Sequence, residues 1–140
     1  MKFLKITNQN DLQILSKFIS SLKEEKETFK YFDKRKIEIV FNHELTFLLF
    51  GIKDEILAYG HIEKEDDNYW LGILVPSKHQ SKGNGVLMIT KLIEESKKLK
   101  IPKITLSVYK TNKKAVHLYN KMGFTVFKEN ESNLFFEKLI

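Results

Sequence analysis

The sequence contains no cysteine among its 140 residues. A disulfide framework, a thiolate zinc site and a cysteine nucleophile are therefore excluded, so any chemistry must rest on oxygen and nitrogen groups. Long apolar runs are missing as well, because no stretch reaches the roughly eighteen residues that a membrane-spanning helix needs. The N-terminus also turns polar too soon for a signal peptide. We therefore expect a cytoplasmic protein without a membrane partner.

Arginine is nearly absent, since Arg35 is the only arginine among 24 basic residues. The formal charge of +6 would attract a polyanion. Proteins that read bases, however, favour the guanidinium group for its bidentate fit to guanine. The lysines also alternate with glutamate, as at residues 23–27, which is typical of a solvated face. Nucleic acid is not expected as a partner.

Repeats, low-complexity tracts and proline-rich linkers are absent too, and the two prolines, Pro76 and Pro102, stand beside predicted strands. Hydrophobic residues make up 42% of the chain, which is enough for one core at this length. We expect residues 1–140 to form a single domain.

Hydrophobic periodicity predicts the elements in the order β-α-α-β-β-β-α-β-α-β-β, a mixed sheet with helices packed against it. The segment at 27–43 suits either a second helix or an irregular loop over a pocket. The expected strands lie at 2–6, 46–52, 56–63, 69–75, 103–109, 124–128 and 133–139, and the expected helices at 12–22, 27–43, 84–99 and 112–121.

A glycine-containing loop joins the strand at 69–75 to the helix that begins near Asn84. Glycines at 83 and 85 let backbone amides approach an anion, and the start of a helix adds unpaired N–H groups and a positive dipole end. Taken alone, a Gly-x-Gly pattern before a helix is also typical of an ordinary tight turn between a strand and a helix, without any ligand. The dinucleotide fingerprint would need a third glycine where Met88 stands, and the Walker loop would need Gly-Lys-Ser/Thr, so neither fits.

A second motif follows the strand at 103–109 and runs from Asn112 through Ala115, Leu118 and Tyr119 to Gly123-Phe124. Each member also has a structural interpretation, as a helix cap, core residue or helix end. Together with Gln80-x-x-Gly83-x-Gly85, this arrangement resembles the GNAT acetyltransferase superfamily over almost the whole chain.

The resemblance implies an α/β fold of the α+β type, with a mostly antiparallel sheet of about seven strands flanked by about four helices. It implies acetyl-CoA as cosubstrate and Tyr119 as the general acid for the departing thiolate. The Val75 amide, or one beside it, would be the oxyanion donor. The implied cofactor-binding residues are Ile73, Leu74, Val75, Gln80, Ser81, Lys82, Gly83, Asn84, Gly85, Val86 and Asn112.

A general base is not evident, because the positions where known members place one hold Tyr69, Leu71 and Ser107. His61 and Glu63 are the local candidates, since alternation puts both on the same face of a strand. A one-residue change of hairpin register would turn that face away from the substrate. In the alternative, non-catalytic interpretation, Glu63 is a strand residue that faces solvent and His61 is a structural histidine whose hydrogen bonds are satisfied.

The resemblance places the substrate pocket on the first two helices and the hairpin after them. We expect an acceptor amine there, with an amino sugar or nucleotide-linked amino sugar favoured over a polyamine and then a peptide. A catalytically silent acyl-CoA-binding module and a protein N-acetyltransferase remain alternative functions. No metal is expected. A homodimer that pairs through residues 124–139 stays open. The candidate substrate residues are Phe29, Tyr31, Phe32, Arg35, Asn42 and His43.

Overall fold

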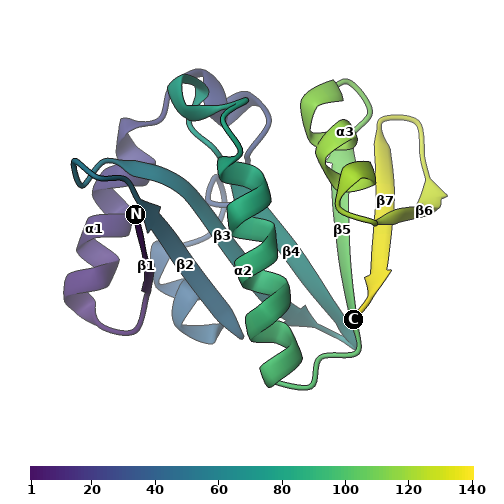
Figure 1. Ribbon diagram of the computed structural model, residues 1–140, viewed down its shortest axis with the longest axis horizontal. Coiled ribbons are helices and arrows are strands. Elements are labelled where there is room, and N and C mark those ends of the chain that lie inside the picture. Colours follow the sequence, from purple (N-terminus) through teal and green to yellow (C-terminus); the bar gives the residue numbers. More distant parts are fainter.

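The computed structural model describes residues 1–140, and one seven-stranded sheet runs through it (Figure 1). The strands are β1 (Lys2–Lys5), β2 (Leu45–Phe50), β3 (Ile56–Glu65), β4 (Asn68–Leu74), β5 (Lys103–Tyr109), β6 (Thr125–Glu129) and β7 (Asn133–Leu139). The helices are α1 (Gln9–Ser21), α2 (Asn84–Lys98) and α3 (Lys113–Lys121), with short 3-10 helices η1 (Glu24–Glu27), η2 (Ile37–Asn42) and η3 (Ser77–His79). The predicted fold class and order of strands are confirmed.

The segment at 27–43 differs from the expected helix. It contains the end of η1, a loop, and η2, with no α-helix between them. Four charged residues in succession, at 33–36, leave no apolar stripe long enough to pack a helix against the sheet. Phe29 and Phe32 instead pack on the ring of Tyr59, at centroid distances of 5.6 and 5.8 Å. The alternative, an irregular loop over a pocket, is the better description.

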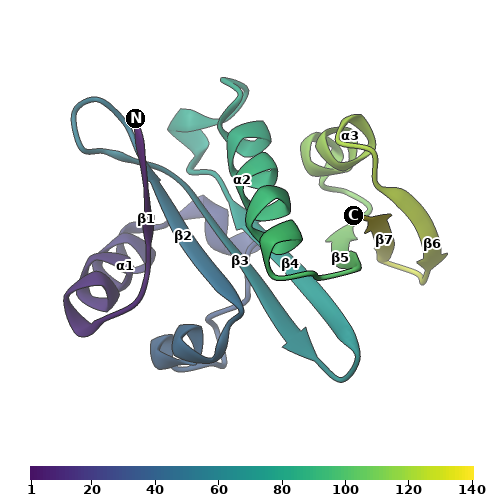
Figure 2. The same cartoon turned by 60° about the horizontal axis from the view of Figure 1, so that its bottom comes forward.

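The two faces of the sheet carry different layers (Figures 1 and 2). On one face, α2 and α3 cover a core that includes Met88, Leu92 and Tyr119. On the other, α1 and η2 enclose a second core with Leu15 and Tyr59. Alternation along β3 therefore directs Tyr59 toward α1, whereas its neighbours Ala58 and Gly60 lie under α2.

The sheet order is β1-β2-β3-β4-β5-β7-β6, in which β4 and β5 form the only parallel pair. Their ladder registers only Trp70 opposite Thr105. Beyond this point the two strands diverge, as Figure 1 shows, toward the ends that lead into η3 and α3. The gap lies in the middle of the molecule.

The last strand in the sheet order, β6, is an edge strand, and its Val126 and Phe127 are 47% and 48% exposed. Such an edge is a surface on which a homodimer through residues 124–139 would pair, a possibility that the sequence leaves open. None of the helices is both long and apolar enough to cross a lipid bilayer.

Candidate active site

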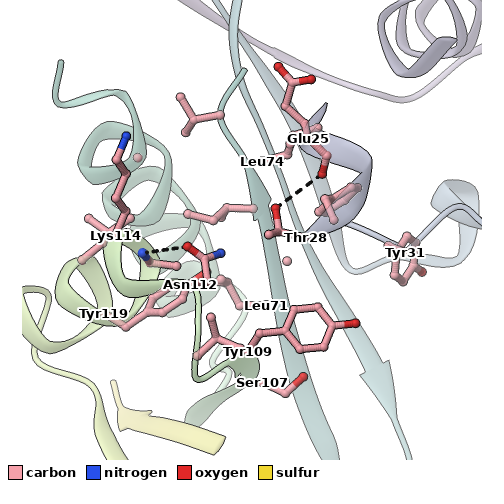
Figure 3. A pocket seen from close by; sticks show the side chains of 18 of the residues that line it. Glu25, Thr28, Tyr31, Leu71, Leu74, Ser107, Tyr109, Asn112, Lys114 and Tyr119 are labelled. Atoms are coloured by element: carbon pink, nitrogen blue, oxygen red, sulfur yellow. Dashed lines mark hydrogen bonds between the residues drawn. The ribbon is translucent and has the colours of Figure 1, made fainter. Parts of the chain in front are cut away.

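A cavity of about 1090 Å³ occupies the gap between β4 and β5. Its lining combines Tyr119 and Leu118 from the α3 face with Phe29 and Tyr31 from the opposite face. Figure 3 shows Tyr119 and Asn112 on one side of β4, and Glu25, Thr28 and Tyr31 on the other. The cavity therefore passes through the sheet and joins its two faces.

The loop between β4 and α2 forms one end of the cavity. Gly83 caps α2 with a φ of 86° and no side-chain hydrogen bond, so the first amides of the helix remain available to a ligand. A Cβ on Gly83 would meet no atom of the protein within 4 Å. Open space, free amides and the helix dipole together suit a phosphate group.

Side chains fix this loop from both ends. Gln80 Nε2 donates to the Val75 carbonyl at 3.0 Å, and Lys114 Nζ on α3 donates to Gln80 Oε1 at 3.3 Å. Asn84 is buried and donates to the His79 carbonyl at 2.9 Å. The predicted contacts of Gln80 and Asn84 are thus partly structural, since both hold the loop in shape.

Tyr119 lies on α3 with its ring packed against Phe124 and Phe136, at centroid distances of 5.8 and 5.9 Å. The residue is 5% exposed, yet it lines the cavity, and no hydrogen bond within the chain engages its hydroxyl. Burial raises the pKa of Tyr119, so the hydroxyl keeps its proton at neutral pH. The side chain at this wall of the cavity is therefore a neutral phenol.

His61 and Glu63 line the cavity from β3. The β3–β4 register sets His61 opposite Gly72 and Glu63 opposite Trp70. A Cβ on Gly72 would lie only 2.5 Å from His61 Cε1, so the imidazole rests on a position that only glycine leaves free. The register thus turns the predicted face toward the cavity, and a catalytic role for either residue stays a prediction.

Three hydroxyl groups are hydrogen-bonded to the imidazoles of His43 and His61, at the end of the cavity that His61 and Glu63 line. Tyr59 Oη is 2.6 Å from His61 Nδ1. Thr46 Oγ1 is 2.8 Å from His43 Nδ1, and Tyr31 Oη is 2.6 Å from His43 Nε2. The rings of His43 and His61 have centroids 4.4 Å apart and are tilted by 38° to each other. The sequence could not predict the Tyr31–His43 hydrogen bond, because the two residues lie 12 positions apart in an irregular segment. Tyr59 and His61 are two residues apart on one strand, so strand alternation predicts that they share a face.

Burial is the main cause of the pKa shifts in this group. It lowers the pKa of His43 to about 4 and that of His61 well below its usual range, and in both cases the charge of Arg35 contributes. Burial also raises the pKa of Tyr31, with a further contribution from hydrogen bonding to Glu63. Both imidazoles are therefore neutral at physiological pH.

Arg35 lies in the loop before η2 and lines the cavity at the end that contains His61 and Glu63. Its guanidinium carbon lies 4.2 Å from the centroid of the Tyr31 ring, and Nη1 donates to the Tyr31 carbonyl at 2.8 Å. Phe29 is 6.4 Å from Tyr31 between ring centroids. The wall is therefore aromatic with one fixed cation.

Glu25, which lies in η1 and lines the cavity, is hydrogen-bonded to η3 in the loop that follows β4. Its carboxylate accepts a hydrogen bond from the Ser77 amide at 2.8 Å, across 52 residues of sequence. This bond is the main reason that the pKa of Glu25 falls to about 2. The sequence indicated a solvated charge run here, and no local pattern reveals the contact.

Replacing Glu25 by glutamine is expected to destabilise the fold by about 1 kcal/mol at neutral pH, because a charged hydrogen bond at a partly exposed site is lost. The folded-state pKa lies below the usual 4.5. The contribution is therefore complete above about pH 4.5 and is lost as the pH falls toward 2. Thermal unfolding at pH 7 and pH 3 should show a smaller difference between variant and wild type at the lower pH. Glu27→Gln in the same segment is the control, and an equal effect there would contradict this role.

Most of the predicted site residues meet at this cavity, and others do not line it. The predicted residues that line it are Phe29, Tyr31, Arg35, His61, Glu63, Ile73, Leu74, Val75, Gln80, Ser81, Gly83, Gly85, Val86, Asn112 and Tyr119. The side chains of Phe32, Asn42, His43, Lys82 and Asn84 are not part of the lining, although His43 contacts it through Tyr31. Asn112 both lines the cavity and caps α3, its Oδ1 accepting from the Ala115 amide at 3.3 Å.

The sequence model of the acetyltransferase (GNAT) family matches residues 12–124, most of the chain. The chain belongs to the GNAT family. It is an acetyl-CoA-dependent N-acetyltransferase, and acetyl-CoA is the family's acetyl donor. The free amides at Gly83 and the open gap between β4 and β5 fit a long phosphorylated thioester.

Solved structures support the fold. A GNAT-family acetyltransferase from Streptococcus pneumoniae is 22% identical, with 99% of this chain and 100% of that chain covered and a TM-score of 0.76. A spermidine N-acetyltransferase from Vibrio cholerae, solved with CoA and spermine, is 19% identical, with 99% and 94% covered and a TM-score of 0.77. PaiA N-acetyltransferase from Thermoplasma acidophilum, solved with coenzyme A, is 17% identical, with 100% of both chains covered and a TM-score of 0.79. Among curated proteins, no sequence gives a significant match.

Proposed function

We propose that this GNAT enzyme acetylates the primary amine of a small molecule that enters from the side of His61 and Glu63. The observation that carries the proposal is the single cavity that connects Tyr119 on one face of the sheet with His61 and Glu63 on the other. A proton donor and two proton acceptors thus open onto the same space from opposite sides. Direct transfer to an amine needs such an arrangement, because one proton is removed from the nucleophile and another is added to the leaving thiolate.

At the donor end, the amides from Ser81 to Val86 would hold the pyrophosphate at the start of α2. Acetyl-CoA supplies the acetyl group as a thioester and leaves as the thiol. The Val75 amide would donate to the developing oxyanion, and the bond from Gln80 to the Val75 carbonyl fixes that end of β4. Tyr119 would deliver its proton to the sulfur.

At the acceptor end, an amine is mostly protonated at neutral pH and must lose a proton before it attacks. Glu63 would take this proton, and neutral His61 would orient the amine through its Nε2. Tyr31 hydrogen-bonds to His43 and interacts with Glu63, so it provides a path along which the proton leaves the cavity. With this arrangement, no base would be needed at Tyr69, Leu71 or Ser107.

The aromatic wall supports an amino sugar as the acceptor. Phe29 and Tyr31 give the cavity an aromatic wall against which a sugar ring would pack, and Arg35 offers a fixed cation for a phosphate or a ring hydroxyl. A polyamine is the second candidate, because Glu63 and Glu65 also line the cavity and would attract a second ammonium group. The spermidine N-acetyltransferase from Vibrio cholerae shares the fold.

Thiol release from acetyl-CoA with a panel of amines tests the proposal. We expect turnover with an amino sugar or a nucleotide-linked amino sugar, slower turnover with spermidine, and none with a lysine-containing peptide. Glu63→Gln should lower kcat/KM for the preferred amine about 100-fold while acetyl-CoA binding is retained. Binding of acetyl-CoA without turnover of any amine would instead favour a silent binding module, and preference for the peptide would favour a protein acetyltransferase.

A further inference from the structure

His43, His61 and Glu63 form a compact group at the acceptor end. One potential ligand atom from each residue lies within 4.8 Å of those of the other two. His61 is 3% exposed, and His43 and Glu63 are partly buried. Two imidazoles and a carboxylate are a ligand set used by zinc sites that keep a fourth position open.

The surroundings of the two imidazoles provide an independent observation. Thr46 Oγ1 binds His43 Nδ1 and Tyr59 Oη binds His61 Nδ1, at 2.8 and 2.6 Å. Both hydroxyl-bearing residues are buried, at 2% and 0% exposure. In metal sites, a partner on one ring nitrogen fixes the orientation of the ligand and leaves the other nitrogen for the ion. Both histidines therefore have the outer partner of a metal ligand, and Nε2 of His43 is in addition hydrogen-bonded to Tyr31 Oη in this structure.

The charges around the group allow a cation to bind. Burial keeps both imidazoles neutral, so no proton has to be displaced at physiological pH. Glu63 supplies a negative charge, and Glu65 lines the same cavity. Arg35, stacked on Tyr31, and Lys30, which lines the same cavity, are positive charges that oppose binding. With two imidazoles and one carboxylate, the group suits a transition-metal ion better than calcium or magnesium, which prefer oxygen ligands.

We propose that His43, His61 and Glu63 bind one divalent transition-metal ion of the zinc type at the acceptor end of the cavity. Donor atoms around tetrahedral zinc are about 3.3 Å apart, so a modest rotation of Glu63 closes the group around the ion. The Tyr31 hydroxyl releases His43 Nε2, which then binds the metal. The fourth position faces the cavity. If the proposed function holds, the ion and the acceptor amine exclude each other, and zinc inhibits by competing with the amine.

Calorimetric titration of the full chain with zinc chloride, without acetyl-CoA or amine, tests the site. We expect one ion per chain. The nearly isosteric variants Tyr59→Phe and Thr46→Val should each weaken zinc binding about 10- to 100-fold, because they remove only the outer partner of an imidazole. The double variant His61→Gln with Glu63→Gln should bind no zinc in a folded sample, as judged by its thermal transition. His117→Gln, which removes an exposed imidazole from the other end of the same cavity, is the control and should bind as wild type does.

Absence of stoichiometric binding by the wild type, or unchanged binding by the double variant, would overturn the site. Unchanged binding by both Tyr59→Phe and Thr46→Val would also overturn it, because it would locate the ion elsewhere. A separate measurement of thiol release distinguishes this proposal from the function. Zinc that binds without raising the apparent KM of the amine would leave the metal site standing and contradict the placement of the acceptor.

Discussion

Replacing Tyr119 by phenylalanine is expected to lower kcat about 100-fold and to leave the dissociation constant of acetyl-CoA unchanged, because only a proton donor is lost. The phenylalanine ring would keep its packing against Phe124 and Phe136, so the fold and the cavity wall should remain. The substitution removes only the hydroxyl from a side chain that is otherwise held by ring packing. Thiol release and acetyl-CoA binding, measured separately, check the two parts of the prediction.

Tyr69→Phe is the matched control for this variant. Tyr69 lies on β4, packs against the same core, and does not line the cavity, so it loses a hydroxyl where no chemistry is expected. Its turnover should equal that of the wild type. Normal turnover in Tyr119→Phe would remove Tyr119 from its role as general acid, whereas loss of acetyl-CoA binding would indicate a role in forming the pocket instead.

Gly83→Val is expected to abolish the stabilisation of the protein by acetyl-CoA. At 100 times its dissociation constant the ligand should stabilise the wild type by about 2.7 kcal/mol. Gly83 has a φ of 86°, which a β-branched residue adopts only with strain. The new side chain would meet no protein atom within 4 Å, so it would extend into the open space at the start of α2, where we expect the phosphates. Thermal unfolding with and without acetyl-CoA measures the effect.

Gly123→Val separates backbone strain from ligand binding. Gly123 has nearly the same conformation, with a φ of 88°, but lies outside the cavity, where a Cβ would approach only the flexible end of Lys138. We expect this variant to unfold at a lower temperature and still to gain stability from acetyl-CoA. Retained stabilisation in Gly83→Val would contradict the assignment of the loop to the phosphates.

The strands and the regular helices could be predicted because their signals are local. Alternation and turn residues gave β5 and β7 their observed bounds, and helical spacing located α1, α2 and α3 within one to three residues. The segment at 27–43 could not be predicted in the same way. Its aromatic residues pack on Tyr59 and on each other, and a contact with a distant strand leaves no period in the sequence.

In the candidate site too, features with a local sequence signal could be predicted, and features that depend on distant contacts could not. The loop around Gly83 and the helix with Tyr119 carry short motifs that the sequence predicts locally, and both line the cavity. The acceptor end depends on pairing across strands, because His61 reaches the cavity only if β3 and β4 adopt the observed register. The bond from Glu25 to Ser77 spans 52 residues, and the role of Thr46 depends on where the loop places His43. These are consequences of tertiary packing that a single sequence does not encode locally.

The divergence of β4 from β5 gives the protein a sheet edge in its interior. Past Trp70 and Thr105 the facing backbone groups of both strands have no ladder partner, and unpaired strand edges are sites where another chain can add. A long ligand lying in the gap would cover this edge as an added strand does. The protein without its acetyl donor should accordingly be the form most prone to aggregation, and the cellular supply of that donor would act on solubility as well as on turnover.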